Sequence, residues 1–179
     1  MNESVMLIPL LCPKCKWPID ADENEVAWVC PDCRQGIFLN DSGQLMEIQV
    51  NYVENIPSGT PGNPFWAMDI NIKIERETFR RDETDEMNNF WEAPRKIFIP
   101  AYQLWLDEII KRAIDHLLNP PWMEPGLAVD FKPVVLPVED LPAYIDFVLL
   151  QMEANRQDYL KKLNYEIQLG ELQLWILPD

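Results

Sequence analysis

Residues 12–33 of this 179-residue chain read CPKCKWPIDADENEVAWVCPDC and contain all four of its cysteines. The cysteines form two matching pairs, Cys12-Pro13-Lys14-Cys15 and Cys30-Pro31-Asp32-Cys33, with fourteen residues between the pairs. A C-x2-C turn presents two sulfur atoms on one side of a short loop, and a hairpin between two such turns brings four sulfurs to one point. The proline after the first cysteine of each pair fixes φ and favours the tight turn. The spacing therefore predicts a four-cysteine metal site.

The segments around the second pair have the pattern of a hairpin. Val26–Val29 is a short strand-like run that leads into Cys30, and Gly36–Leu39 is its expected return strand. The acidic residues 20–25 have the composition of a turn. Two cysteine turns joined to a hairpin are typical of a zinc ribbon. We therefore predict a ribbon whose metal ligands are Cys12, Cys15, Cys30 and Cys33.

The cysteine pattern has other readings: a disulfide pair, a redox C-x-x-C motif, or iron in place of zinc. Disulfides need an oxidising compartment, and residues 1–11 lack the basic start and the long apolar stretch of an export signal. A redox motif occurs once, at a helix start in a βαβ unit, whereas this motif occurs twice beside predicted strands. Iron binds similar cysteine loops, so it remains an alternative to zinc at this site. A closed four-thiolate site favours one structural zinc ion in a cytoplasmic protein.

The chain after the cysteines divides at a run rich in proline and glycine. Residues 44–53 alternate apolar and polar side chains, which predicts a half-buried strand. Residues 55–63, NIPSGTPGN, have the composition of a linker or long turn. We therefore predict a zinc ribbon with its following strand at 1–54, a linker at 55–63 and an α+β domain at 64–179.

The predicted α+β domain has strand patterns on either side of helix patterns. Alternation indicates strands at 65–74 and 97–99, and apolar residues recur at helical spacing over 106–117 and 141–152. The charged residues 75–89 are expected to form an exposed loop or a strand end running into one. These patterns predict an α+β fold, with an antiparallel sheet of about five strands and two amphipathic helices on one of its faces.

The last residues of the chain have the pattern of a hairpin. Residues 163–169 alternate apolar and polar side chains, and residues 172–176 continue the alternation. Between them, Gly170-Glu171 has glycine in the first position, as a two-residue type II′ turn requires. We predict a C-terminal hairpin with this turn.

The charge of the chain limits its choice of partners. It has 15 basic and 30 acidic residues, for a formal net charge of −15. Nucleic-acid affinity is dominated by lysine and arginine contacts to phosphates, so direct nucleic-acid binding is unlikely in this chain. No apolar run approaches the eighteen or so residues that a membrane span requires. We expect a protein partner or self-association, and no membrane span.

No set of catalytic residues stands out in the sequence. His116 is the only histidine, and no serine or cysteine nucleophile lies near it in the sequence. Adjacent carboxylates are common in a chain this acidic, and nothing marks one of them as buried. The six glycines form no phosphate-binding loop. We therefore predict no catalytic residues and no enzymatic activity.

Tryptophan and leucine near the chain end are the candidates for partner contact. Trp175 and Leu177 fall on the nominally polar side of the last predicted strand, and Trp66 lies close to a proline at a strand start. Apolar side chains on a wet face indicate that something covers them. The cover is either another part of this chain or a partner, since tryptophan is favoured at interface hot spots. On the second reading, Trp175, Leu177 and Trp66 bind a partner.

Three further motifs carry a resemblance. They are Pro64-Phe65-Trp66, Phe98-Ile99-Pro100-Ala101 and the terminal Leu174-Trp175-Ile176-Leu177-Pro178. With the N-terminal ribbon, this set resembles uncharacterised bacterial zinc-ribbon proteins. The resemblance implies no activity and carries over only the four metal ligands. The chain departs from the usual ribbon because Lys16 and Arg34, rather than glycine, follow the two cysteine pairs.

Three hypotheses for function remain. The leading one is a non-enzymatic adaptor or accessory subunit that mediates protein–protein assembly in a larger complex. The alternative is a zinc-ribbon factor associated with transcription or nucleic acid, acting through a polymerase rather than through DNA itself. The third is an enzyme with its site between sheet and helices, which would need a buried carboxylate of raised pKa in a pocket.

Overall fold

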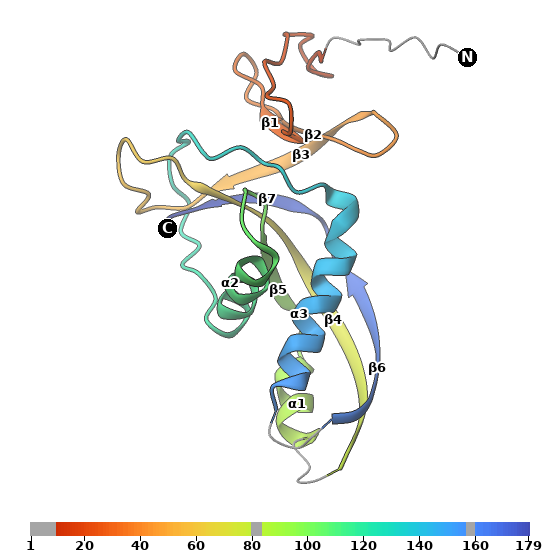
Figure 1. Cartoon of the computed structure of the whole chain (residues 1–179). Coiled ribbons are helices and arrows are strands. Elements are labelled where there is room, and N and C mark those ends of the chain that lie inside the picture. Colours follow the sequence, from red (N-terminus) through yellow and green to blue (C-terminus); the bar gives the residue numbers. More distant parts are fainter. Residues whose placement is uncertain (1–9, 80–83, 157–159) are drawn as a thin grey trace, which may run out of the picture.

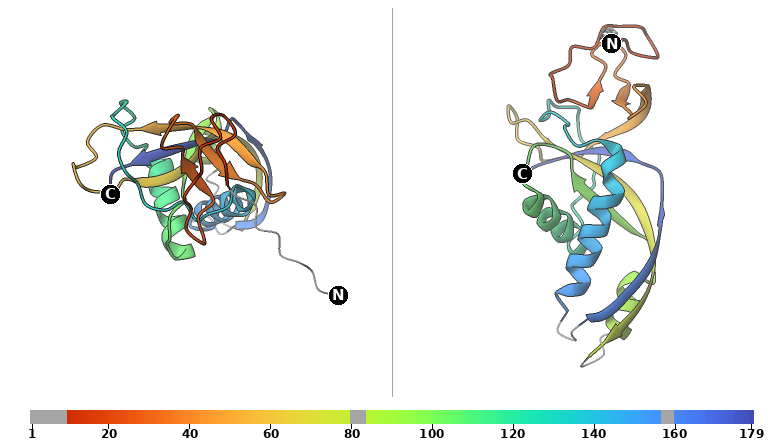
Figure 2. Two further views of the ribbon diagram at one scale, coloured as in Figure 1. Left: turned by 90° about the horizontal axis from the view of Figure 1, so that it is seen from above. Right: turned by 45° about the vertical axis from the view of Figure 1, so that its right-hand side comes forward.

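The computed structural model describes residues 10–79, 84–156 and 160–179, and within them it contains seven strands, three α-helices and one short 3-10 helix (Figure 1). The strands are β1 (Ala27–Val29), β2 (Gly36–Leu39), β3 (Leu45–Tyr52), β4 (Asn63–Thr78), β5 (Arg95–Pro100), β6 (Leu160–Leu169) and β7 (Gln173–Leu177). The helices are α1 (Thr84–Trp91), α2 (Leu106–Leu118), the 3-10 helix (Val138–Asp140) and α3 (Leu141–Ala154). Figure 2 shows an elongated molecule with β1 and β2 at one end and α1 at the other.

The described strands form one mixed sheet in the order β1-β2-β3-β7-β4-β5, with β6 also paired to β4. β7 lies between β3 and β4, parallel to β3 and antiparallel to β4. The prediction of a wholly antiparallel sheet is therefore wrong at the β3–β7 pair. Leu174 and Ile176 of β7 are fully buried, and a central place in the sheet removes more of their apolar surface from water than an edge would.

The predicted C-terminal hairpin is wrong as well. β6 and β7 do not pair with each other; they lie end to end along one side of β4, which runs for sixteen residues. β6 pairs with Ile70–Thr78 and β7 with Asn63–Ala67. At the junction the Gly170 N–H donates to the Asp69 carbonyl oxygen at 2.7 Å. Gly170 thus lies at the break between two strands that follow one another along the same side of β4, because pairing along most of β4 forms more backbone hydrogen bonds than a short hairpin would.

Both faces of the central sheet carry apolar clusters, and this explains the apolar residues on the nominally polar side. Trp66 and Ile99 belong to the larger cluster, together with buried residues of α2 and α3. Phe65, Phe98 and Leu177 belong to a second cluster on the alternate positions of the same strands. The chain therefore covers both faces at the centre of the sheet.

The two longer helices differ in what they bury. α2 packs along β5, and its buried residues are Ile109, Ala113 and Leu117. α3 buries apolar residues and also Glu153. Each helix leaves apolar residues exposed: Leu106 and Leu118 of α2 are 46% and 52% exposed, and Phe147 and Leu150 of α3 are 46% and 42% exposed. None of the described helices is long and apolar enough to cross a membrane.

The charged stretch at 75–89 matches its prediction in part: a strand end runs into it, as expected, but the helix α1 was not predicted. β4 continues through it as far as Thr78, and α1 begins at Thr84. Residues 80–83 lie outside the described residues. β4 extends this far because β6 supplies hydrogen-bond partners up to Thr78, which no local pattern could reveal.

The division of the chain at residues 55–63 stays a prediction. β3 pairs with β2 on one side and with β7 on the other, so the strand before that run takes part in both ladders. Beyond β3, the Val26 N–H donates to the Val134 carbonyl at 2.8 Å, and this bond ties the hairpin β1–β2 to a distant segment.

Candidate metal centre

Two loops of equal geometry carry the four cysteines. The Lys16 N–H donates to the Cys12 carbonyl and the Arg34 N–H to the Cys30 carbonyl, each at 2.9 Å. Each loop then closes with a second bond, from Cys12 to the Trp17 carbonyl and from Cys30 to the Gln35 carbonyl. The second loop joins β1 to β2, whose register pairs Val29 with Gly36. The two C-x2-C turns thus present their sulfurs in the same way.

The four sulfur atoms converge on one point. All four lie within 4.8 Å of one another, with Cys12 Sγ 3.6 Å from Cys33 Sγ and Cys15 Sγ 3.5 Å from Cys30 Sγ. A tetrahedral ion with metal–sulfur bonds of about 2.3 Å places its sulfurs about 3.8 Å apart. The cysteines are free, and these separations are far longer than a disulfide of about 2.05 Å. Four cysteines from two loops that are separate in the sequence therefore form a group that could hold one metal ion.

The protonation of the free thiols shows why a cation suits this group. Hydrogen bonds from the backbone of Cys15 lower the pKa of Cys12 to about 7 despite its burial. The backbone at Trp17 lowers the pKa of Cys15, but burial and the other three cysteines outweigh it and raise that pKa to about 12. Four adjacent thiols cannot all ionise near neutral pH without a positive charge among them.

Lys16 and Arg34 occupy backbone positions that favour glycine. Their φ angles are 64° and 61°, in the left-handed region that costs a residue with a Cβ atom about 1–2 kcal/mol. Both follow the last cysteine of a pair, where the usual ribbon has glycine. The loops keep the required conformation with a cationic residue in each place, directly after Cys15 and Cys33 in the sequence.

The cluster is enclosed by its own chain. Cys12 and Cys30 are fully buried, and Cys15 and Cys33 are half-buried. All four candidate ligands are protein sulfurs, and a tetrahedral ion bound to four of them has no position left for a substrate. The site therefore has the chemistry of a structural metal centre.

The three predicted partner-contact residues are placed differently from one another. Trp66 is fully buried and its indole N–H donates to the Leu136 carbonyl at 2.8 Å. Leu177 is 1% exposed within the second apolar cluster. Neither has surface to offer a partner in this structure. Trp175 is half-buried on Phe98, with ring centroids 6.4 Å apart, and only its partner contact stays a prediction.

His116 is held between aromatic rings. Its ring centroid lies 5.0 Å from that of Phe65 and 5.9 Å from that of Phe98. Burial lowers its pKa and the nearby Arg112 guanidinium lowers it further. Phe65 and Phe98 belong to β4 and β5, so the imidazole packs α2 against the sheet.

The structure contains a buried carboxylate that no pattern in the sequence indicated. Glu153 is fully buried and accepts hydrogen bonds from Arg156 at 2.8 Å and from the Trp91 indole at 3.4 Å. Arg76 lies 3.6 Å away and is also buried. These residues come from α3, the residues just after it, α1 and β4, so no spacing in the sequence marks them. Two arginines compensate the carboxylate, which suits a structural ion pair joining three elements.

Comparison with protein-family models, with curated proteins and with solved structures gave no match for this chain.

Proposed function

We propose that the protein is a non-enzymatic adaptor, in which the four cysteines hold one structural zinc ion and the helical side of the molecule docks a protein partner. The observation that carries the docking role is an exposed apolar groove between α2 and α3. A tetrathiolate site is easiest to keep in a reducing compartment, so the proposed location is the cytoplasm.

The groove is built from both helices. Leu106, Ile110 and Ile114 follow one another at intervals of four residues along α2, and Gln151 of α3 lies opposite them. Trp105 stands at one end of the groove and is 80% exposed. The groove encloses about 650 Å³. A row of apolar side chains at helical spacing is suited to the apolar face of a helix from another protein.

Exposed apolar residues also occur on α3, on the turns before the groove residue Gln151. Phe147 and Leu150 are 46% and 42% exposed, and Leu106 of α2 is 46% exposed. A soluble protein rarely leaves large apolar side chains together in water unless the surface binds something, and tryptophan is favoured at the centre of such interfaces. We propose this surface as the partner contact in place of Trp66 and Leu177.

Nucleic acid is the less favoured partner. The cysteine loops carry two cationic residues, Lys16 and Arg34, but the formal net charge of the whole chain is −15. Sequence-independent affinity for nucleic acid depends on many such cations acting together. A salt-titrated binding assay with duplex DNA and single-stranded RNA tests this alternative, and we expect no binding at low salt.

Paired variants test the adaptor role. Leu106→Gln together with Phe147→Gln should abolish recovery of a stoichiometric partner from native lysate, or self-association measured by light scattering, while elemental analysis still finds one zinc per chain. Leu127→Gln is the matched control, because Leu127 is 88% exposed and lies outside the groove. A strictly monomeric protein without a stoichiometric partner, or equal recovery by both variants, would disprove the proposal.

A further inference from the structure

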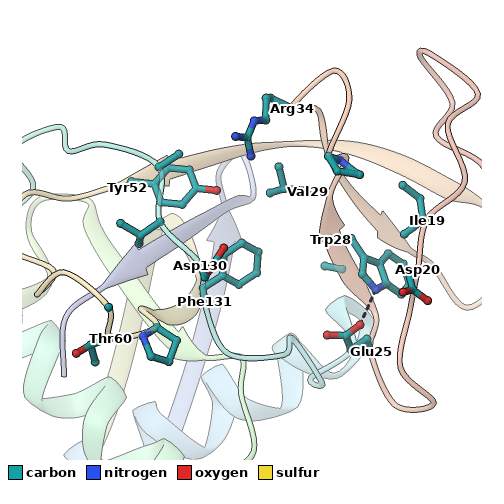
Figure 3. Close-up of a pocket in the computed structure, with 16 residues that line it drawn as sticks. Ile19, Asp20, Glu25, Trp28, Val29, Arg34, Tyr52, Thr60, Asp130 and Phe131 are labelled. Atoms are coloured by element: carbon teal, nitrogen blue, oxygen red, sulfur yellow. Dashed lines mark hydrogen bonds between the residues drawn. The ribbon is translucent and has the colours of Figure 1, made fainter.

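A second cavity lies between the four-cysteine end and the rest of the molecule, and none of its lining residues belongs to the groove on α2 and α3. Figure 3 shows Trp28 and Glu25 on one wall and Tyr52, Phe131 and Thr60 on the other. The cleft has a volume of about 980 Å³, at the upper end of the range for ligand pockets. It therefore has room for several residues of a peptide rather than for a single ion.

The walls of the cleft are fixed to one another by backbone hydrogen bonds. Ala27 beside Trp28 bridges to Val134, and Phe131 bridges to Gly62. The Lys132 N–H and the Gly62 carbonyl are 2.9 Å apart, and the Gly62 N–H donates to the Asp130 carbonyl at 2.8 Å. Tyr52 is on β3, which pairs with strands on both sides. A cleft held in this way loses little conformational freedom when it binds.

Aromatic and proline side chains provide the apolar surface of the cleft. The Trp28 indole N–H donates to the Glu25 carboxylate at 2.9 Å, and this bond fixes the orientation of the ring. Tyr52 is half-buried, and this burial raises its pKa, so its hydroxyl is protonated at neutral pH. Pro31 and Pro61 also line the space. Aromatic-lined grooves of this kind bind extended segments that contain proline, because such segments are already ordered before binding.

Charge in the cleft favours a cation. Asp20, Glu25 and Asp130 line it, against the single guanidinium of Arg34. Figure 3 shows Arg34 above the space, with Asp130 beside Phe131 and Asp20 beside Trp28. The carboxylates thus lie next to aromatic faces, which attract cations as well. An excess of carboxylates disfavours an anionic ligand, including a nucleic acid.

We propose that this cleft binds an extended, proline-containing segment of a partner protein that carries an arginine or lysine side chain. The prolines lie against Tyr52 and Phe131, beside the ring of Trp28, a residue that is 7% exposed. The basic side chain lies among the carboxylates of Asp20, Glu25 and Asp130. This inference goes beyond the proposed adaptor role, since the cleft and the groove on α2 and α3 are separate surfaces.

The test uses the full chain with its metal and three capped peptides. They are Pro-Pro-Arg-Pro-Pro and the same peptide with glutamine or glutamate in place of arginine. Binding is followed by the nitrogen-15 NMR signal of the Trp28 indole N–H. We expect saturable shifts with the arginine peptide, and at least about tenfold weaker binding of the glutamate peptide at low salt.

Substitutions in the cleft separate charge from packing. Asp20→Asn with Asp130→Asn should weaken the arginine peptide several-fold and leave the glutamine peptide unchanged. The matched control is Asp22→Asn, because Asp22 is exposed in the same loop as Asp20 but does not line the cleft. Leu106→Gln with Phe147→Gln should leave peptide binding unchanged, so failure of the adaptor role and failure of this inference are distinguishable.

Three results would overturn the inference. The first is equal affinity for the arginine and glutamate peptides. The second is the absence of any shift of the Trp28 indole signal at millimolar arginine peptide. The third is an equal loss of affinity in Asp22→Asn and in the Asp20→Asn, Asp130→Asn variant.

Discussion

At one end of the molecule, four sulfurs from residues 12–33 lie within 4.8 Å of one another. At the centre, β4 is held by β5, β6 and β7, whose residues come from 95–100 and 160–177. Within residues 10–39, the buried hydrophobic residues are only Cys12, Ala27, Trp28, Cys30 and Ile37, and two of these are candidate ligands. The central sheet buries large side chains on both faces. A metal ion bound by the four cysteines would therefore stabilise the first region, whereas apolar burial stabilises the second.

The largest expected effect is loss of the metal. Removing the ion with a chelator, or changing Cys30→Ser, should unfold the β1–β2 end, because a site of this type contributes on the order of 10 kcal/mol to folding. The NMR signal of the Trp28 indole should collapse while that of the buried Trp66 indole persists. Two results would contradict separate stabilisation of the two regions. One is elemental analysis that finds no bound metal in the untreated protein, and the other is simultaneous loss of the Trp28 and Trp66 signals.

The reverse experiment breaks the sheet and spares the metal site. Trp66→Ala should destabilise the protein by about 3–5 kcal/mol, because it empties a fully buried position and leaves the Leu136 carbonyl without its donor. Denaturant unfolding measures the change, and a cobalt-substituted sample reports by its absorption spectrum whether the four thiolates still bind. Trp105→Ala is the control, since Trp105 is 80% exposed and should change stability little. Loss of cobalt binding in Trp66→Ala would show that the cysteine end depends on the sheet.

A smaller effect tests the backbone of the cysteine loops. Lys16→Gly and Arg34→Gly should each stabilise the metal-bound protein by about 1 kcal/mol, because both residues have φ near 60°. Lys14→Gly is the control within the same loop: Lys14 does not have positive φ, so glycine there should destabilise. The free energy of unfolding at fixed zinc activity is the measurement. Destabilisation by both glycine variants would show that the side chains of Lys16 and Arg34 contribute more than the relief of strain.

The smallest effect concerns His116. Because its pKa is lowered in the folded protein, the unfolded state binds its proton first as pH falls. The stability that the neutral imidazole contributes is therefore complete above the unfolded pKa of about 6.5 and decreases as pH falls through the folded value. His116→Gln should flatten the dependence of unfolding free energy on pH below about 6.5, compared with the parent protein at the same zinc activity. Parallel curves for the two proteins would rule out this contribution.

Much of the local structure was readable from short-range patterns. The strand predicted at 44–53 is β3 (Leu45–Tyr52), and the helical patterns at 106–117 and 141–152 correspond to α2 and α3. These patterns depend on neighbours a few residues apart, which a sequence displays directly. The groove and the cleft could not be found in this way, because each combines residues from separate elements. The Glu153 ion pairs were missed for the same reason.

The cysteine cluster and its two loops follow from local sequence, since all four candidate ligands lie within 22 residues and the turn chemistry is local. The place of β7 between β3 and β4, and the position of Gly170 between two strands on one side of β4 instead of in a hairpin turn, depend on contacts between distant segments. Strand order depends on how well the whole of β4 can be paired and how much apolar surface each arrangement buries. Alternation gives the two faces of a strand but not the identity of its neighbours.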